Sequence, residues 1–416
     1  MSRFQDVVAK PDFPAMEREI LAWWTQDGIM QAYLNRNKGA AERFGFIDGP
    51  ITANNPMGVH HGWGRTYKDL FQRFHTMLGK EQRYQNGFDC QGLWVEVEVE
   101  KELGLKSKRD IETYGIAEFV NRCKERVWKF SERITDQSIR LGYWMDWDNS
   151  YYTMSDENNY TIWHFLKQCH DRGWIYKGHD SMPWCPRCGT GISEHEIVTE
   201  GYQDRTHLSL FVGYPIVERP GEELMVWTTT PWTLAANVAA AVNPKLTYAR
   251  LKVGDRIFYV GKDAIANAIK GDYELLDELQ GSDLLGLTFR APFDDFPANE
   301  GVRHIVIPWD DVSAVEGTGI VHIAPGAGKE DFQLSKVNDL DVIAPLNESG
   351  IYMDGFDWLT GQYVHDVATP IMRDLEKRGF LYRSQQYTHR YPVCWRCGTD
   401  LAFRLVDEWF ISMDQL

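Results

Sequence analysis

Two cysteine pairs constrain the fold of this 416-residue chain more than any other feature of its sequence. The segments Cys185-Pro-Arg-Cys188-Gly-Thr and Cys394-Trp-Arg-Cys397-Gly-Thr are near copies, although about 200 residues separate them. Four thiolates suit a closed, tetrahedral zinc site with a structural role. The sequence therefore predicts that the two distant segments meet at one zinc ion. Two free thiol pairs or a redox motif are the alternative, which the duplicated form does not favour.

The charge balance argues against a general nucleic-acid-binding surface. Lysine and arginine number 44 against 60 acidic residues, which gives a net charge of −16, so any RNA contact must come from local patches. No run approaches 18 apolar residues, and the N-terminus, Met1 to Lys10, lacks the pattern of a secretion signal. We expect a soluble, cytoplasmic protein with no membrane segment. The three isolated cysteines, Cys90, Cys123 and Cys169, are expected to be small buried hydrophobes.

The N-terminal part of the chain has the pattern of an α/β fold. Residues 44–50 predict a short buried strand and residues 83–89 a second strand, with a helix over about 60–78 between them. This order predicts a βαβ unit and a parallel sheet. The apolar residues of the intervening helix recur at three- and four-residue intervals and predict its core face: Tyr67, Leu70, Phe71, Phe74 and Leu78. Longer helical patterns cover residues 115–141 and 156–172, and Gly173 is expected to cap the second.

From residue 201 to about 385 the pattern changes to short alternating runs broken by glycine and proline, which is typical of a β-rich domain. The cysteine pairs stand directly before and after this block. An inserted domain is the simplest interpretation, because a four-cysteine site would join the two ends of the block.

Two segments of the N-terminal part could bind a substrate. The loop from Gly49 to Gly64, GPITANNPMGVHHGWG, leads into a helix, whose N-terminal N–H groups and dipole favour phosphate. A structural turn is the alternative. Asp89 ends the second strand, where ligands of a doubly wound sheet bind, and it could hold an ammonium group or cap the following helix.

The inserted block has its own group of polar residues. Thr228-Thr-Thr-Pro-Trp-Thr-Leu-Ala-Ala-Asn237 is followed downstream by Gly317-Thr-Gly-Ile-Val-His322 and by Asp331. Hydroxyls, a carboxamide, an imidazole and a carboxylate could surround an ester and a water molecule. Ordinary strand threonines and an unremarkable histidine are the alternative.

In this order along nearly the whole chain, these segments resemble the isoleucyl-tRNA synthetases of class I. His60-His61-Gly62-Trp63 resembles the HIGH signature of that family, and Gly87-Phe-Asp89-Cys-Gln-Gly-Leu resembles its Gly-Trp-Asp-Cys-His-Gly-Leu segment. Thr-Thr-Thr-Pro-Trp-Thr-Leu at residues 228–234 is similar to the form found in the isoleucine enzymes, whereas the valine and leucine relatives have Thr-Thr-Arg-Pro.

The resemblance implies a domain order. It predicts the first half of a Rossmann-type catalytic domain at residues 1–180, a split zinc knuckle at 181–200 and 386–404, an inserted editing domain at 201–385, and re-entry into the catalytic domain at 405–416.

Two features depart from the family pattern. Trp63 stands where the second histidine of the signature contacts the ATP phosphates. Either His61 or a backbone amide compensates, or the chain belongs to a variant subgroup. No Lys-Met-Ser-Lys-Ser-like loop occurs, since Gln333-Leu-Ser-Lys336 is a poor match within the inserted block. We therefore expect this chain to be the N-terminal portion of a longer enzyme, incompetent for adenylation by itself.

The resemblance also implies the ligands: isoleucine, ATP with Mg²⁺, tRNA(Ile) and structural Zn²⁺, bound by a monomer. The implied catalytic residues are His60 and Gly62, and the implied ATP-binding residues are His60, His61, Gly62 and Gly64. Pro50 and Asp89 would bind the amino acid. The implied editing residues, which would hydrolyse valyl-tRNA, are Thr228, Thr229, Thr230, Thr233, Asn237, His322 and Asp331.

Two other functions remain open. A free-standing aminoacyl-tRNA deacylase would use the inserted block alone. A non-enzymatic, zinc-stapled RNA-binding module would use the local basic residues Lys106, Lys108, Arg109, Arg122, Lys124 and Arg126.

Overall fold

The computed structural model describes residues 9–415 and, within them, every side chain except those of residues 198–200. The expected absence of a secretion signal falls largely on residues 1–8, which lie outside the described residues, as does residue 416. Between residues 9 and 415, no helix combines the length and the apolarity needed to cross a membrane. The chain divides into two compact units, Met1–Gly173 and Trp174–Leu416.

The first unit is an α/β domain. Its elements follow each other as α1 (Phe13–Gln26), α2 (Ile29–Leu34), β1 (Arg43–Ile47), β2 (Ile51–Thr52), α3 (Val59–Met77), β3 (Glu81–Asp89), α4 (Leu93–Leu103), α5 (Lys108–Tyr114), α6 (Ile116–Arg140), β4 (Asp146–Tyr152) and α7 (Asp156–Asp171). The predicted helices agree with α3, α6 and α7 within one residue at each end. Gly173 follows the C-cap of α7 with a left-handed φ of 71°, as its expected capping role requires.

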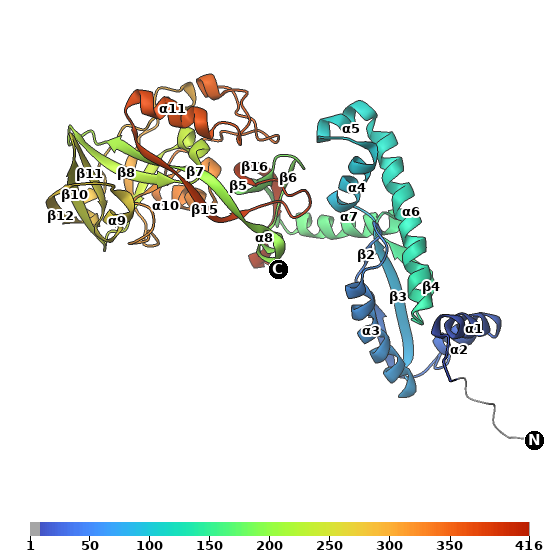
Figure 1. The fold of residues 1–416 in the computed structure, drawn as a ribbon. Coiled ribbons are helices and arrows are strands. Elements are labelled where there is room, and N and C mark those ends of the chain that lie inside the picture. Colours follow the sequence, from blue (N-terminus) through green and yellow to red (C-terminus); the bar gives the residue numbers. More distant parts are fainter. Residues whose placement is uncertain (1–8, 416) are drawn as a thin grey trace, which may run out of the picture. The chain divides into compact units, whose positions relative to one another are not determined.

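The sheet of this unit is parallel, which confirms the predicted βαβ arrangement. Its central strand is β3, and β1, β2 and β4 all pair with it in parallel. Phe88 pairs with both Ile51 and Tyr152, so β1 and β2 follow one edge of β3 and β4 follows the other. Figure 1 shows α3 running beside β3.

The expected burial of the first strand is wrong. Exposed and half-buried residues alternate along β1, and Ile47 is 64% exposed. The reason is that β1 is an edge strand, with β3 as its only partner among the described residues.

The expected core face of α3 is also wrong. Its five predicted residues are between 52% and 61% exposed: Tyr67, Leu70, Phe71, Phe74 and Leu78. The buried residues of α3 are polar, namely Arg65, Gln72 and Thr76. Two of them find hydrogen-bond partners on surrounding elements, Asp48 for Arg65 and the Tyr33 hydroxyl for Thr76, whereas the amide nitrogen of Gln72 is buried without a partner among the described residues.

The second unit is rich in β-structure. Its elements are β5 (Ile175–Cys185), β6 (Thr190–Gly191), α8 (Glu194–Glu200), β7 (Tyr202–Pro215), β8 (Glu222–Thr228), β9 (Ala239–Val242), β10 (Thr247–Val253), β11 (Arg256–Gly261), α9 (Ile265–Ala268), β12 (Glu274–Gln280), β13 (Ile305–Pro308), β14 (Val321–Ile323), α10 (Lys329–Asn338), α11 (Ala368–Arg378), β15 (Leu381–Pro392) and β16 (Ala402–Ile411). Six strands form one sheet in the order β12-β10-β11-β8-β7-β15 (Figure 1). The β-rich pattern of this region is therefore confirmed.

Two long strand pairs join segments that are distant in the sequence. β7 pairs antiparallel with β15, from Tyr202 opposite Pro392 to Val212 opposite Leu381. β5 pairs antiparallel with β16. The chain therefore passes through β5 before it forms the six-stranded sheet, and through β16 after it. This arrangement places both cysteine pairs at the same end of the β7–β15 ladder.

The isolated cysteines behave nearly as expected. Cys90 and Cys169 are buried, whereas Cys123 is only half-buried. Cys123 packs against the apolar cluster that contains Cys90. Burial raises the pKa of the Cys123 thiol to about 11, so it is a neutral side chain at pH 7.

Candidate functional site

A cavity of about 290 Å³ lies at the start of α3 in the first unit. Its walls come from the segment that follows β1 and from one face of α3, and its lining residues are Asp48, Gly49, Pro50, Ile51, Thr52, His60, His61, Gly64, Arg65 and Lys68. The helix begins after Gly58, where a Cβ would lie only 2.8 Å from the His60 ring. A side chain at position 58 would therefore require the His60 ring to shift.

His61 closes the first turn of α3. The backbone N–H of Gly58 donates to Nδ1 of His61 (3.1 Å), so the neutral ring carries its proton on Nε2. Burial, and then the charges of His60 and Arg65, lower the pKa of His61. The ring is therefore neutral at pH 7 and has an N–H that can donate to an anion.

Trp63 and Gly62 belong to a different cavity from His60 and His61. Trp63 is 64% exposed, and it lines a cavity of about 820 Å³ together with Gly62, Trp24 and Leu141. The carbonyl of Gly62 accepts a hydrogen bond from the Tyr143 hydroxyl (2.5 Å). Of the predicted ATP-binding residues, His60, His61 and Gly64 thus share one cavity and Gly62 does not.

Asp89 lies at the carboxyl end of β3, beside the 290 Å³ cavity. The hydroxyls of Thr52 and Thr153 donate to its two oxygens, over 3.0 and 3.4 Å. The alternative that Asp89 caps the next helix is wrong, because α4 is capped by Gly92 without any side-chain bond. Thr52 lines the cavity and links it to Asp89.

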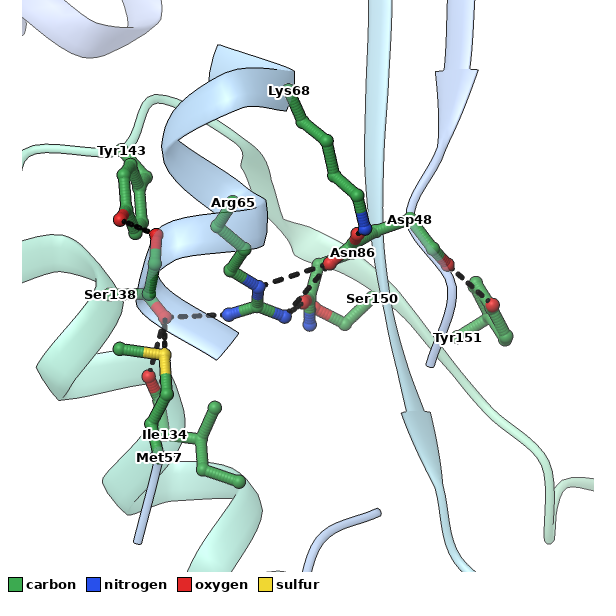
Figure 2. Close-up of polar contacts among 11 residues, drawn as sticks. Asp48, Met57, Arg65, Lys68, Asn86, Ile134, Ser138, Tyr143, Ser150 and Tyr151 are labelled. Carbon is green, nitrogen blue, oxygen red and sulfur yellow. Dashed lines mark hydrogen bonds and ion pairs between the residues drawn. The ribbon is translucent and has the colours of Figure 1, made fainter. Parts of the chain in front are cut away.

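Three residues that line this cavity, Asp48, Arg65 and Lys68, belong to a largely buried polar network (Figure 2). The Arg65 guanidinium donates through Nε to the Asp48 carboxylate (3.1 Å), and its other nitrogens reach Ser138 (2.6 Å) and Asn86 (2.7 Å). Lys68 Nζ lies 2.6 Å from the other oxygen of the same carboxylate. The network ties α3 to β3, α6 and the end of β1 (Figure 2).

Half of the candidate RNA-binding lysines and arginines are neutralised within the first unit. Lys108 pairs with Glu96 and Glu100, Arg122 pairs with Glu125, and Arg126 pairs with Glu102. Arg126 is also buried, and it donates to the side chain and carbonyl of Asn54. Its contacts hold the loop that precedes His60 rather than an external ligand.

The four cysteines of the second unit come together, as their spacing predicts. Their sulfur atoms all lie within 4.8 Å of one another: Cys185, Cys188, Cys394 and Cys397. Cys185 ends β5, and the second pair lies in the turn between β15 and β16. Hydrogen bonds from the neighbouring thiols, above all Cys185, hold the pKa of Cys397 below its usual range, whereas hydrogen bonds to the other cysteines and burial raise the pKa of Cys185.

The geometry of this cluster suits zinc. A tetrahedral ion with Zn–S bonds of about 2.3 Å places its sulfurs about 3.8 Å apart. The Sγ atom of Cys397 lies 3.5 Å from that of Cys185 and 3.6 Å from that of Cys188. The set is closed, since the four thiols leave no fifth ligand among the described residues.

A second polar cluster lies in the inserted block, and we call it the threonine–histidine cluster: Thr228, Thr230, Thr233, Asn237 and His322. Thr228 ends β8, and His322 lies on β14. Thr230, Thr233 and Asn237 lie in the segment that follows β8. Thr229 is half-buried at the start of that loop, and its hydroxyl makes no hydrogen bond to any described residue. The sequence pattern thus places five of its seven editing candidates in direct contact.

The hydrogen-bond partners fix every proton direction around His322. The amide nitrogen of Asn237 faces the carbonyl of Ala239 (2.9 Å), which can only accept, so it also donates to Nδ1 of His322 (3.1 Å). Nε2 of His322 therefore carries the proton and donates to the Thr233 hydroxyl (2.7 Å). That hydroxyl donates its own proton to the carbonyl of Thr230 (2.8 Å). Burial lowers the pKa of His322 to about 4, which keeps this neutral form at pH 7.

Asp331, the seventh candidate, stands in the first turn of α10. Its Oδ2 accepts from the backbone N–H of Ala324 (2.7 Å), two residues after His322. Burial raises the pKa of Asp331 to about 6. A Cβ on Gly328 would lie 2.8 Å from this carboxyl group, so a larger residue there would have to displace it. The carboxylate is mostly ionised at pH 7 and could pair with an ammonium group.

A comparison with protein families decides the relationship. The family described as tRNA synthetases class I (I, L, M and V) matches residues 19–416 of this chain. The chain belongs to these class I tRNA synthetases.

Several relatives of this synthetase chain are isoleucine–tRNA ligases of bacteria. The isoleucine–tRNA ligase of Clostridium tetani is 37% identical over 415 residues, which cover 99% of this chain and 40% of the relative. The isoleucine–tRNA ligases of Thermus thermophilus and Thermobifida fusca are 40% and 38% identical, over 97% and 98% of this chain and 39% of each relative. The chain thus spans about 40% of the length of these relatives.

A solved structure entitled "The crystal structure of GlLeuRS-CP1" has a TM-score of 0.37 and 15% identity to this chain. The match covers 42% of this chain and 96% of the chain in that structure.

Three residues of the synthetase cavity are not among those that the sequence singles out: Asp48, Arg65 and Lys68. Asp48 stands directly before the Gly-Pro turn, and Arg65 and Lys68 follow His61 and Gly64 by one helical turn. This spacing after the histidines is the signal that could have found the two basic residues.

Proposed function

We propose that this chain is the N-terminal part of an isoleucine–tRNA ligase, which activates isoleucine with ATP and transfers it to tRNA(Ile). The observation that carries the proposal is the match to isoleucine–tRNA ligases at 37–40% identity over nearly the whole chain. We propose the domain order implied by the sequence: a Rossmann-type half at 1–180, split zinc knuckles, an editing domain at 201–385 and re-entry at 405–416.

In the activation site, the residues of the first unit bind and orient substrates. His60 and His61 would donate to phosphate oxygens of ATP, the latter through the Nε2 proton that its contact with Gly58 leaves in place. Pro50 would contact the amino acid and Asp89 would hold its ammonium group. Mg²⁺ bound to ATP would neutralise phosphate charge. Catalysis of this kind depends on positioning and charge stabilisation.

In the editing site, the second unit would hydrolyse valine attached to tRNA(Ile). One methylene in an apolar pocket discriminates by only about 1–3 kcal/mol, a magnitude for which isoleucyl-tRNA synthetase is itself a standard example. A second, hydrolytic site would remove the errors. Asp331 would hold the ammonium group of the attached valine, and the threonine–histidine cluster would orient the ester and a water molecule.

The proton directions support a water nucleophile in that site. The Thr233 hydroxyl accepts from His322 and donates to the Thr230 carbonyl, so His322 does not remove its proton. We propose that His322 acts as a hydrogen-bond donor. The cysteine cluster would hold Zn²⁺ through Cys185, Cys188, Cys394 and Cys397, and this ion would join the two ends of the inserted block.

Hydrolysis of valyl-tRNA(Ile) by the 416-residue chain tests the proposal. We expect deacylation above background at high protein concentration, with isoleucyl-tRNA(Ile) cleaved more slowly. Asp331→Ala should slow it about ten- to a hundredfold, because a charge-assisted hydrogen bond contributes roughly 1.5–3 kcal/mol. Glu376→Gln, on the exposed face of α11, is the control. Equal rates for Asp331→Ala and wild type would remove Asp331 from the site.

Pyrophosphate exchange separates the ligase from a free-standing deacylase. Trp63 lies outside the cavity of His60 and His61, and the chain spans only about 40% of its relatives. We therefore expect isoleucine-dependent exchange by the isolated chain to stay far below about 1 s⁻¹. The sequence of the source gene distinguishes the two functions, since a Lys-Met-Ser-Lys-Ser loop encoded beyond residue 416 would support the ligase and its absence would favour the deacylase.

A further inference from the structure

Lys68 stands apart from the other basic groups around the 290 Å³ cavity. His60, Gly64 and Lys68 follow each other at four-residue intervals, so they occupy one face of α3 over about 12 Å of helix axis. All three line the cavity. A Cβ built on Gly64 would meet no atom within 4 Å. The helix surface between the first histidine and the lysine is therefore open.

The acidic and basic residues that line the cavity leave a positive balance. Asp48 is fully buried and contributes one negative charge, whereas Arg65, also buried, and Lys68 each contribute a positive charge. Arg65 alone would neutralise Asp48. Lys68 is thus a surplus cation, held at the cavity wall by a carboxylate that already has a partner (Figure 2).

The two cations differ in what they can still bind. The guanidinium of Arg65 is occupied by Asp48, Asn86 and Ser138, and its side chain is 1% exposed. The side chain of Lys68 is 33% exposed, and Asp48 is the only hydrogen-bond partner of its ammonium group among the described residues. An ammonium group has three donors, so two remain for an anion in the cavity.

We infer that Lys68 binds the phosphate groups of ATP in this cavity, an inference that rests on the proposed ATP-binding function. The side chain of Trp63 lies in the other cavity and supplies no donor here. A phosphate chain along the open face of α3 would meet the His61 N–H near the start of the helix and the Lys68 ammonium group two turns later. Asp48 orients the ammonium group through one carboxylate oxygen, and Arg65 pairs with the other oxygen.

A structural role predicts a different result. If Lys68 only neutralises Asp48, its loss should change the stability of the first unit and leave phosphate affinity unchanged. Lys101 is a matched control, because it pairs with a carboxylate on α4 over a similar distance (2.7 Å to Glu98) and lies outside the cavity.

The test is calorimetric titration of the 416-residue chain with ATP and, separately, with inorganic tripolyphosphate. We expect Lys68→Met to weaken both ligands about tenfold, the size of one charge-assisted hydrogen bond. Lys68→Arg, which keeps the charge, should stay within about threefold of wild type, and Lys101→Met should bind as wild type does. Lys68→Gln serves the same purpose if the methionine variant does not fold, as thermal unfolding will show.

Each adverse outcome has a distinct meaning. Unchanged ATP affinity in folded Lys68→Met overturns the inference and leaves the proposed ATP site standing. Equal weakening by Lys101→Met also overturns it, because the effect would then be general electrostatic attraction. Failure of the wild-type chain to bind ATP or tripolyphosphate overturns both the inference and the proposed ATP site.

Discussion

At the scale of single residues, His322 is defined by neighbours that can only accept a hydrogen bond. The carbonyls of Ala239 and Thr230 orient the groups on either side of the ring, and so they decide which ring nitrogen carries the proton. The amide nitrogen of Asn237 lies between the Ala239 carbonyl and the ring and donates to Nδ1 of His322. A carboxylate in its place could not donate to Nδ1 and would instead favour a protonated ring.

Asn237→Asp should therefore raise the pKa of His322 from about 4 to above its ordinary value of about 6.5. The measurement is an NMR titration of the His322 ring. Asn237→Ala is the control: it removes the donor without adding charge, and the pKa should stay low because burial, its cause, remains. The same pKa in both variants would mean that Asn237 does not set the protonation of His322.

His322 and Asp331 should also oppose each other in the pH dependence of stability. Between pH 4 and 6, folded Asp331 keeps a proton that the unfolded chain has released, so its contribution falls as the pH rises. Over the same range the unfolded chain protonates His322 and the folded chain does not, so that contribution rises. The two slopes, each about 1.4 kcal/mol per pH unit, nearly cancel.

In Asp331→Asn, the pH dependence of stability that His322 contributes should no longer be cancelled. Relative to wild type, the free energy of unfolding of the variant should increase by about 3 kcal/mol in total between pH 4 and pH 6. Urea unfolding of the 416-residue chain at several pH values measures the difference. The exposed Glu376→Gln should give a difference that does not vary with pH. A flat difference for Asp331→Asn would show that this carboxyl group titrates normally in the folded chain.

At the scale of elements, the cysteine pairs and α3 show what sequence patterns determine. The cysteine spacing predicted a contact between distant segments, because each pair supplies only two of the four ligands of a structural zinc ion. The strand pairs β7–β15 and β5–β16 build that contact. The periodicity of α3 predicted the helix correctly but assigned the wrong face to the core. Periodicity indicates that an apolar face needs cover, but it does not say which part of a protein supplies it.

The same limit applies to the candidate sites. Motifs identified His60, His61, Thr233 and His322, because their residue types carry recognisable chemistry. Arg65 and Lys68 were not found, since their importance depends on the buried carboxylate of Asp48, which is visible only once the sheet brings the end of β1 against α3. Proton directions depend in the same way on backbone carbonyls that no motif encodes.

If α3 packs through its polar face, then Arg65→Met should destabilise the first unit by about 3–5 kcal/mol, since it removes the main partner of a buried carboxylate. Phe71→Gln, on the exposed apolar face, should change stability by no more than about 0.5 kcal/mol. Hydrogen exchange of the α3 and β3 amides measures both. A larger effect of Phe71→Gln than of Arg65→Met would mean that the helix packs through its apolar face after all.

The zinc knuckles make an element-scale prediction of their own. The purified chain should hold about one zinc ion, and Cys394→Ser should lose it and speed hydrogen exchange at the facing ends of β5 and β15. Cys123→Ser, outside the cluster, should retain the metal. Elemental analysis measures the zinc content. Stoichiometric zinc in the double variant Cys185→Ser/Cys394→Ser would rule out a site shared by the two pairs.

At the scale of the whole molecule, the exposed face of α3 is the feature that most needs an explanation. Trp63, Tyr67, Leu70, Phe71 and Phe74 are each more than half exposed and form one side of a single helix. Soluble monomers rarely leave a large contiguous apolar patch open, and such patches usually mark an interaction surface. Among the described residues, β1 is also an edge strand of the same unit, and edge strands can pair with another chain.

The resemblance to isoleucyl-tRNA synthetases implies a monomer, but a monomer with this face open would expose several aromatic rings to water. We therefore expect the 416-residue chain to associate reversibly through α3 at tens of micromolar and to bind a hydrophobic dye. Leu70→Glu combined with Phe74→Lys should weaken both effects, because burying either charge in the contact would cost several kcal/mol. Sedimentation velocity over a concentration series measures the association.

Trp409→Glu, which alters an exposed aromatic residue of the second unit, is the matched control and should leave the association unchanged. Since both variants replace exposed apolar groups by charges, a difference between them would assign the contact to α3 rather than to general hydrophobicity, and equal behaviour would remove α3 from it.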